Sequence, residues 1–205
     1  GEGSVNQAPI TGESVPVDKR AVDDPKQAAA NPEQLEPQYR VFAGTIKGKN
    51  QLLAGGMTHL SENCVLNVKN KSHSVTAEIV VPEGGAKGVI IAQGADIGGW
   101  SLYAKGGKLK YCYNWGGFKH FFAEGATVLT PGEHQVRMEF AYDGGGLGKG
   151  GKVTLFVDGK KDGEGRVDMT VPMLFSADET CDVGKETGSA VSPDYGPTDN
   201  EFNGE

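Results

Sequence analysis

Acidic side chains and glycines gather in two segments of the sequence that could together hold a calcium ion. Asp143 opens the loop DGGGLGKGG, and Asp178, Glu179 and Asp182 lie in the segment SADETCDVG. Calcium takes about six to eight oxygen ligands from carboxylates and carbonyls. Neighbouring glycines leave main-chain carbonyls accessible. The alternative is that these acids stabilise turns in a structured loop. We expect no cofactor other than this possible calcium ion.

Aromatic side chains are concentrated between residues 100 and 122. Aromatic faces can stack on sugar rings, so this segment could form a carbohydrate platform. Trp100, Tyr113 and Trp115 are the candidate contacts, and we expect Trp115 to be the most exposed of them. The alternative is that these rings pack in the core or against another domain, because strand alternation turns half of them inward.

Other chemistry is poorly supported by residue spacing. The histidines form no metal-ligand pair, and the widely spaced cysteines form neither a zinc set nor a disulfide framework. These residues are His59, His73, His120, His134, Cys64, Cys112 and Cys181. The glycine loop 143–151 lacks the spacing and the Ser or Thr of a phosphate-binding loop. We interpret the cysteines as buried small apolar residues.

The composition limits the function classes. The chain has 205 residues, 32 of them glycine, and a formal net charge of −7. This charge, without a basic stripe, argues against nucleic-acid binding and indicates an acidic surface. No apolar run approaches the roughly 20 residues of a membrane span. The start GEG has neither the positive nor the apolar region of a signal peptide, so the compartment stays open.

Strand patterns fill the chain from Val41 onward. Residues 73–81 and 134–142 alternate apolar and polar side chains with period two. WSLYAKGGKLKYCYNW (100–115) is typical of a hairpin with its turn at 105–108. Further strands are expected at 88–94, 152–159 and 166–175, the last two separated by a turn at 160–165. Short strands divided by glycine turns predict an all-β, antiparallel sandwich.

Residues 1–53 resemble part of the actuator domain of heavy-metal P-type ATPases. The resemblance rests on SVNQAPITGESVPVDK (4–19) and RVFAGTIKG (40–48), joined by a polar, proline-rich stretch at 21–40. It implies that the TGES glutamate positions a water for attack on an aspartyl phosphate. The motif residues are Thr11, Gly12, Glu13 and Ser14. Because no DKTGT phosphorylation motif accompanies them, we expect no activity at Glu13.

Residues 55–205 resemble the C-terminal domain of bacterial arylsulfatases. The strings that carry the resemblance are GGMTHLSENCVLNVKNKSHSVTAEIVVPEGGAKGVIIAQG (55–94), GGWSLYAKGGKLKYCYNWGGF (98–118), EFAYDGGGLGKGGKVTLFVDGKK (139–161) and FSADETCDVGKETGSAVSPDYGP (175–197). The resemblance implies a concanavalin-like jelly roll that packs against a catalytic domain. It also implies that EFNGE (201–205) begins a last strand. No cysteine lies in the formylglycine motif of sulfatases.

These observations predict a composite chain without catalytic activity of its own. We expect an accessory sandwich of an arylsulfatase-like hydrolase (55–205) joined to an inactive ATPase fragment (1–53), with a sulfatase catalytic domain or a sulfated glycan as partner. The alternatives are a cation-transport ATPase fragment and a lectin-like carbohydrate-binding module. Residues 1–40 are expected to be poorly ordered, and residues 41–53 either pair with the sandwich or do not.

Overall fold

The computed structural model describes residues 2–5, 17–20, 49–175 and 180–205, to which every structural statement below refers. Within them the chain is all β, apart from the short 3-10 helix η3 (Glu62–Cys64). No helix among these residues is long and apolar enough to cross a lipid bilayer. The predicted all-β class is confirmed.

In the described part of the chain, nine antiparallel strands form one sheet in the order β11-β4-β5-β6-β7-β10-β9-β8-β3. The strands are β3 (His73–Val81), β4 (Gly88–Ala95), β5 (Gly98–Lys105), β6 (Lys108–Trp115), β7 (Lys119–Val128), β8 (Gly132–Tyr142), β9 (Lys149–Val157), β10 (Lys160–Met169) and β11 (Cys181–Val183). Two meanders, β4–β7 and β8–β10, meet where β10 pairs with β7. Their turns therefore alternate between two opposite ends of the sheet.

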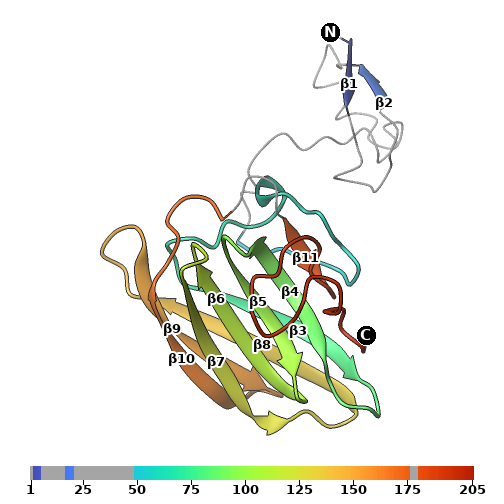
Figure 1. Ribbon diagram of the computed structural model, residues 1–205, viewed down its shortest axis with the longest axis vertical. Helices are drawn as coiled ribbons and strands as arrows, with labels where there is room; N and C mark the ends of the chain where they lie inside the picture. Colours follow the sequence, from blue (N-terminus) through green and yellow to red (C-terminus); the bar gives the residue numbers. More distant parts are fainter. Residues whose placement is uncertain (1, 6–16, 21–48, 176–179) are drawn as a thin grey trace.

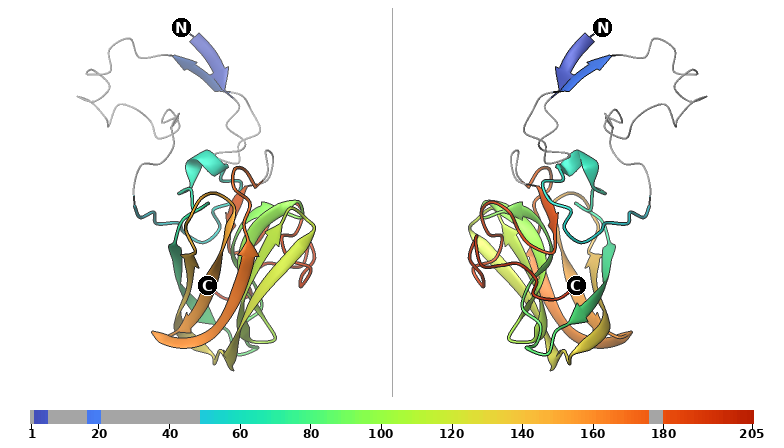
Figure 2. Two further views of the ribbon diagram at one scale, coloured as in Figure 1. Left: turned by 90° about the vertical axis from the view of Figure 1, so that its left-hand side faces the viewer. Right: turned by 90° about the vertical axis from the view of Figure 1, so that its right-hand side faces the viewer.

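The sheet curls so that β4–β7 form one layer and β3 with β8–β10 form the other (Figures 1 and 2). The core lies between these layers. Val136, Met138 and Phe140 of β8 are buried, as the period-two pattern predicts, and they join Leu102 and Tyr111 in one apolar cluster. The arrangement is the predicted concanavalin-like jelly-roll sandwich.

Most of the expected strands are present, but the turn expected at 160–165 is wrong. These residues lie inside β10, which pairs with both β7 and β9. Its glycines permit close approach of main chains, since a Cβ added at Gly163 would lie 2.2 Å from the Glu124 carbonyl oxygen, and one at Gly165 would lie 2.4 Å from that of Phe122. β7 itself was not assigned as a strand by the sequence pattern.

Strands β4–β6 are buried on both faces. Their inner face lines the core, and their outer face is covered by residues 184–200, hereafter the strap. A second apolar cluster of Val89, Ala92, Tyr103 and Cys112 lies on this outer face, with Tyr195 of the strap packed against it. The side chains that the strap covers are therefore protected from solvent without belonging to the main core.

The described C-terminal residues run between the two edges of the curled sheet. Glu201 forms an isolated parallel bridge with Val89 at the start of β4. Glu205 and Val80 of β3 exchange two main-chain hydrogen bonds, of 2.7 and 3.2 Å. Among the described residues, 201–205 form this bridge and this hydrogen-bonded pair but no strand, so the strand start implied by the resemblance is not seen. Among the described strands, β3 is paired with β8 alone.

At the N-terminal end, β1 (Glu2–Val5) and β2 (Val17–Arg20) pair with antiparallel register. The TGES residues 11–14, the linker 21–40 and the possible edge strand at 41–47 lie outside the described residues. The described part of the sandwich begins slightly before residue 55, because the Gln51 carboxamide hydrogen-bonds the main chain of Cys64 and Leu66.

The buried carboxamide of Asn114, on β6, holds three separate segments together. Its Nδ2 donates to the carbonyl oxygens of Ala95, Asp96 and Val191 at 2.8 to 3.2 Å. Its Oδ1 accepts from the Gly117 amide at 2.8 Å. The β4–β5 turn, the β6–β7 turn and the strap are thus joined by one fully hydrogen-bonded side chain.

Replacing Asn114 with alanine leaves these buried main-chain groups without partners. We expect Asn114→Ala to lower the free energy of unfolding by about 3 kcal/mol. Asn67→Ala is the control, because Asn67 is exposed and its side chain caps only the Lys69 amide at 3.0 Å. Urea titration followed by tryptophan fluorescence measures both variants. Equal, small losses in the two variants would contradict this role of Asn114.

Candidate functional site

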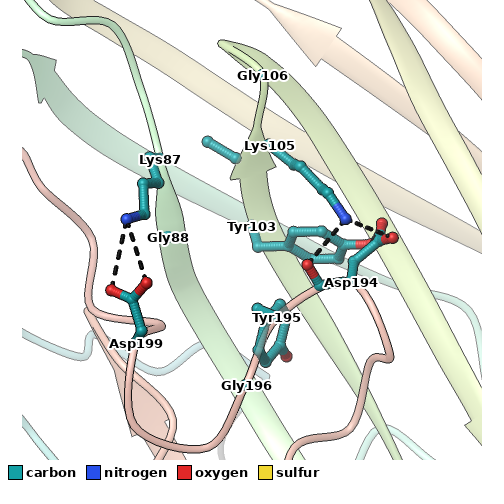
Figure 3. Close-up of a pocket in the computed structure, with 10 residues that line it drawn as sticks. Lys87, Gly88, Tyr103, Lys105, Gly106, Asp194, Tyr195, Gly196 and Asp199 are labelled. Carbon is teal, nitrogen blue, oxygen red and sulfur yellow. Dashed lines mark hydrogen bonds and ion pairs between the residues drawn. The ribbon is translucent and has the colours of Figure 1, made fainter.

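A small pocket lies between the strap and strands β4 and β5, at the end of the sandwich that carries the β5–β6 turn (Figure 3). Its volume is about 390 Å³, near the lower limit for small-molecule sites of roughly 300–1,000 Å³. The strands and the β5–β6 turn contribute one side of the pocket and the strap the other. The lining side chains discussed below are Lys87, Tyr103, Lys105, Asp194, Tyr195 and Asp199.

The strap is fixed over the sheet by buried acidic and amide side chains. Asp182 of β11 accepts hydrogen bonds from the Thr187 amide and hydroxyl and from the His59 amide, at 2.6 to 2.8 Å. Glu186 accepts from the Val191 amide at 3.0 Å. Asn200 donates to the carbonyl oxygens of Glu186 and Gly196. The pocket wall formed by the strap is therefore held in place before any ligand binds.

Asp194 is the electrostatic centre of the pocket wall. Its carboxylate accepts from the Tyr103 hydroxyl and from Lys110 Nζ, each at 2.6 Å, and from Lys105 Nζ at 2.9 Å. Lys105 also donates to the Asp194 carbonyl oxygen at 2.8 Å. Charge-assisted hydrogen bonds of this length are among the stronger polar contacts in proteins. Figure 3 shows Lys105 reaching across the pocket from β5 to the strap.

These contacts determine the ionisation of the group. Burial acts to raise the pKa of the Asp194 carboxyl, but the hydrogen bonds from Lys110, Tyr103 and Lys105 outweigh it, so the pKa lies well below its usual value. Burial, with the hydrogen bond to Asp194, raises the pKa of the Tyr103 hydroxyl far above its usual range. Asp194 is therefore a fixed anion and Tyr103 a fixed donor at neutral pH.

Two tyrosine rings separate this centre from a second ion pair. The rings of Tyr103 and Tyr195 meet edge to face with centroids 5.1 Å apart, and the Tyr195 hydroxyl donates to Ser101 Oγ at 2.7 Å. On the far side, Lys87 Nζ lies 3.4 Å from Asp199 Oδ1. Both partners of this pair are largely exposed, so it contributes little to stability and is easily rearranged.

The predicted calcium ligands take structural partners where they are described. Asp143 lies in the β8–β9 loop and forms a bidentate pair with Arg166, and Asp182 holds the strap as described above. Asp178 and Glu179 lie outside the described residues. In the described ranges no three His, Cys, Asp or Glu side chains come together in a way that could hold a metal ion. The calcium site stays a prediction.

The predicted sugar-stacking residues occupy different environments. Trp100 is only 3% exposed, and its indole Nε1 donates to Gln93 Oε1 at 3.1 Å. Tyr113 is buried, and its hydroxyl accepts from the Val171 amide at 2.8 Å. Both therefore pack as in the core alternative. Trp115 is partly exposed, with its ring 6.0 Å from that of Phe118. None of the three lines the pocket described above.

Sequence reasoning did not find Asp194, Tyr195 or Lys105. Asp194 and Tyr195 occur in the string SPDYG, which the sequence presents as an ordinary turn. Lys105 flanks a hairpin turn, where an exposed charge is unremarkable. A signal was present in the alternation of Lys108 and Lys110, which places two cations on one face of β6. Lys110 pairs with Asp194, which is more than eighty residues away in sequence, so the pattern could not identify this partner.

Comparisons with known proteins add little beyond the fold. No protein-family model matches the chain, and no curated protein matches it. Solved structures similar to it include domains LG4–5 of the mouse laminin α1 chain and a native heptameric SAP-like pentraxin from Limulus polyphemus. The laminin match has 18% identity and a TM-score of 0.43, and covers 73% of this chain and 39% of that chain. The pentraxin match has 10% identity and a TM-score of 0.29, and covers 67% and 80%.

This chain thus spans about two fifths of the laminin chain that it matches. Both TM-scores lie below 0.5, so neither likeness carries an argument about function. The resemblances to arylsulfatases and P-type ATPases gain no support from these comparisons and stay predictions. The fold class rests on the strand order and register given above.

The pH dependence of stability tests the role of Asp194. Because its pKa is lower in the folded chain than the roughly 3.9 of an unfolded chain, the ionised carboxylate stabilises the folded state above about pH 4, and this contribution is lost as the pH falls further. We expect Asp194→Asn to cost about 1–2 kcal/mol in unfolding free energy at neutral pH. The difference from the parent chain should shrink steadily under acidic conditions.

Urea unfolding of both chains between about pH 7 and pH 3 measures this difference. Asp199→Asn serves as the control, since its exposed pair with Lys87 should change stability by less than about 0.5 kcal/mol. A pH-independent difference between Asp194→Asn and the parent chain would exclude the ionised carboxylate as its cause.

Proposed function

We propose that the sandwich is a non-catalytic carbohydrate-binding module and that the pocket beneath the strap is its ligand site. The observation that carries this proposal is the mixture of donor and acceptor side chains around the pocket. Lys105 and Lys87 supply donors, Asp194 and Asp199 supply acceptors, and a tyrosine ring lies between the two pairs. Sugar hydroxyls both donate and accept, so they suit such a mixed surface.

The charge balance of the pocket favours a polyhydroxylated ligand over a strongly charged one. Its two lysines face two aspartates, and each lysine lies within ion-pair distance of one of them. A highly charged ligand would displace one partner of each pair and leave the other without compensation. A neutral sugar adds hydrogen bonds to groups that already cancel in charge. The glycines Gly106 and Gly196 keep the entrance open for a bulky ring.

The cysteine environments support a role without covalent catalysis. Burial raises the pKa of the Cys112 thiol to about 12 and that of the Cys181 thiol to about 12. Such thiols stay protonated and unreactive at neutral pH, since the thiolate is the nucleophile. Cys112 lies beneath the strap, where it packs with Tyr103 and Val89. Both side chains are accounted for by packing.

A narrower proposal rests on the sequence alone. The resemblance of residues 55–205 to arylsulfatase C-terminal domains supports a module that accompanies a sulfatase catalytic domain and serves substrates bearing sulfated sugars. No contact among the described residues bears on that partner. We therefore state carbohydrate binding as the function, with the sulfatase partnership as its possible setting.

Filling the pocket should abolish ligand binding without unfolding the chain. A Cβ added at Gly196 has no neighbour within 4 Å, and the residue does not adopt a left-handed conformation, so Gly196→Phe can be accommodated. We expect neutral oligosaccharides found on a glycan array to bind the parent chain in calorimetry. Gly196→Phe should weaken that binding by about a hundredfold, and Lys105→Met by about tenfold.

The matched control is Gly55→Phe, which also has open space around its Cβ and lies in the segment that contacts β11, away from the pocket. It should bind as the parent chain does. If the array shows no bound sugar, or if Gly196→Phe binds normally, the proposed site is wrong. If only sulfated glycans bind on the array, the ligand of the pocket is anionic and the proposal of a neutral sugar is wrong.

A further inference from the structure

The end of the sandwich opposite the pocket carries an unusual set of exposed apolar side chains. Five large apolar residues on its loops are 51% to 86% exposed. They are Ile97, Phe118, Leu147, Met173 and Leu174, hereafter the apolar rim. Their loops are the β4–β5 turn, the β6–β7 turn, the β8–β9 loop and the segment after β10, all at the end where η3 lies (Figure 1).

The four loops form one continuous surface. A Cβ added at Gly117 would lie 3.0 Å from the Asp96 carbonyl oxygen, so the β4–β5 and β6–β7 turns touch. One added at Gly98 would lie 3.4 Å from the Phe175 carbonyl oxygen, which brings the segment after β10 against them. One added at Gly148 would lie 3.4 Å from the Thr170 carbonyl oxygen, which adds the β8–β9 loop.

Two asparagines fix these loops in place. Asn114 joins the β4–β5 and β6–β7 turns, as described above. Asn70 joins the other two, since its Nδ2 donates to the Pro172 carbonyl oxygen at 2.6 Å and its Oδ1 accepts from the Gly148 amide at 2.8 Å. The rim is therefore preorganised, and a partner that covers it does not have to order its loops.

We propose that the apolar rim is the contact surface between two copies of this chain. Exposed apolar patches on monomers rarely exceed roughly 300–600 Å². Five large apolar side chains, each at least half exposed, are enough to form a patch of this size. A stable interface needs about 800 Å² from each partner, with an apolar centre and a polar surround. The rim supplies such a centre, and the loop main chains around it supply the remainder.

The charges beside the rim are compatible with a second copy as the partner. Lys119 lies 3.1 Å from Asp168, and Arg166 pairs with Asp143 at 2.8 Å, so these charges cancel within each copy. A two-fold contact places identical surfaces face to face. Charges that are already paired within each copy do not repel their counterparts across such a contact, whereas unpaired charges of one sign would. The net charge of −7 also disfavours adsorption to an anionic lipid surface.

Sedimentation velocity of the full chain at rising concentration tests the proposal. We expect a species of twice 21.6 kDa to dominate at high micromolar concentration. The double substitution Phe118→Ser with Met173→Ser should raise the dissociation constant of the dimer about tenfold or more. The control pair Val80→Ser with Val128→Ser removes exposed apolar side chains near the ends of β3 and β7, outside the rim, and should leave the dimer intact.

Urea unfolding of each variant shows whether it is folded, and a folded double variant should keep its sugar binding, because the rim and the pocket lie at opposite ends. Dimerisation is thereby separable from the proposed function. A parent chain that stays monomeric at the highest concentration overturns the proposal. So does a dimer that survives the rim substitutions, or a monomer that binds neutral lipid vesicles through the rim.

Discussion

The carboxamide of Asn114 is the contact on which both ends of the molecule depend. It lies on β6, where it ties the turns on either side of it to each other and to the strap. Without it the two turns that present Ile97 and Phe118 have no common anchor. The strap would also lose one of its attachments to the sheet, the hydrogen bond at Val191. One buried, fully hydrogen-bonded amide therefore specifies several loops at once.

The sequence predicts the fold well in strands whose side chains alternate between apolar and polar, and in short hairpin turns. Residues 73–81 coincide with β3, and 105–108 is indeed the turn between β5 and β6. The pattern fails at 160–165, because glycine has two uses that sequence does not distinguish. It permits turns, and it also allows neighbouring main chains to approach closely, as Gly163 and Gly165 do in β10.

The pocket was out of reach of the sequence for a different reason. Its central residue, Asp194, is made significant by Lys105, Lys110 and Tyr103, and these contacts join the strap to strands more than eighty residues earlier. Rules based on the spacing of nearby residues cannot predict contacts between segments this far apart in the sequence. The aromatic pattern of β5 and β6 was visible, but a residue count cannot say which face the strap will cover. In the structure, Trp100 and Tyr113 are buried, while Tyr103 lies beside the pocket.

The antiparallel meander explains why polar and apolar surfaces separate so cleanly. Alternate turns must lie at opposite ends, so the β3–β4 and β5–β6 connections meet the strap at one end, with lysines facing aspartates. The β4–β5, β6–β7 and β8–β9 connections and the segment after β10 lie at the other end and carry the apolar rim. The core between the two layers is formed by other residues, and none of the five rim side chains belongs to it. The exposure of these side chains is therefore not needed for folding and points to a partner. A partner that covers the apolar rim leaves the pocket accessible, because the pocket lies at the opposite end of the sandwich.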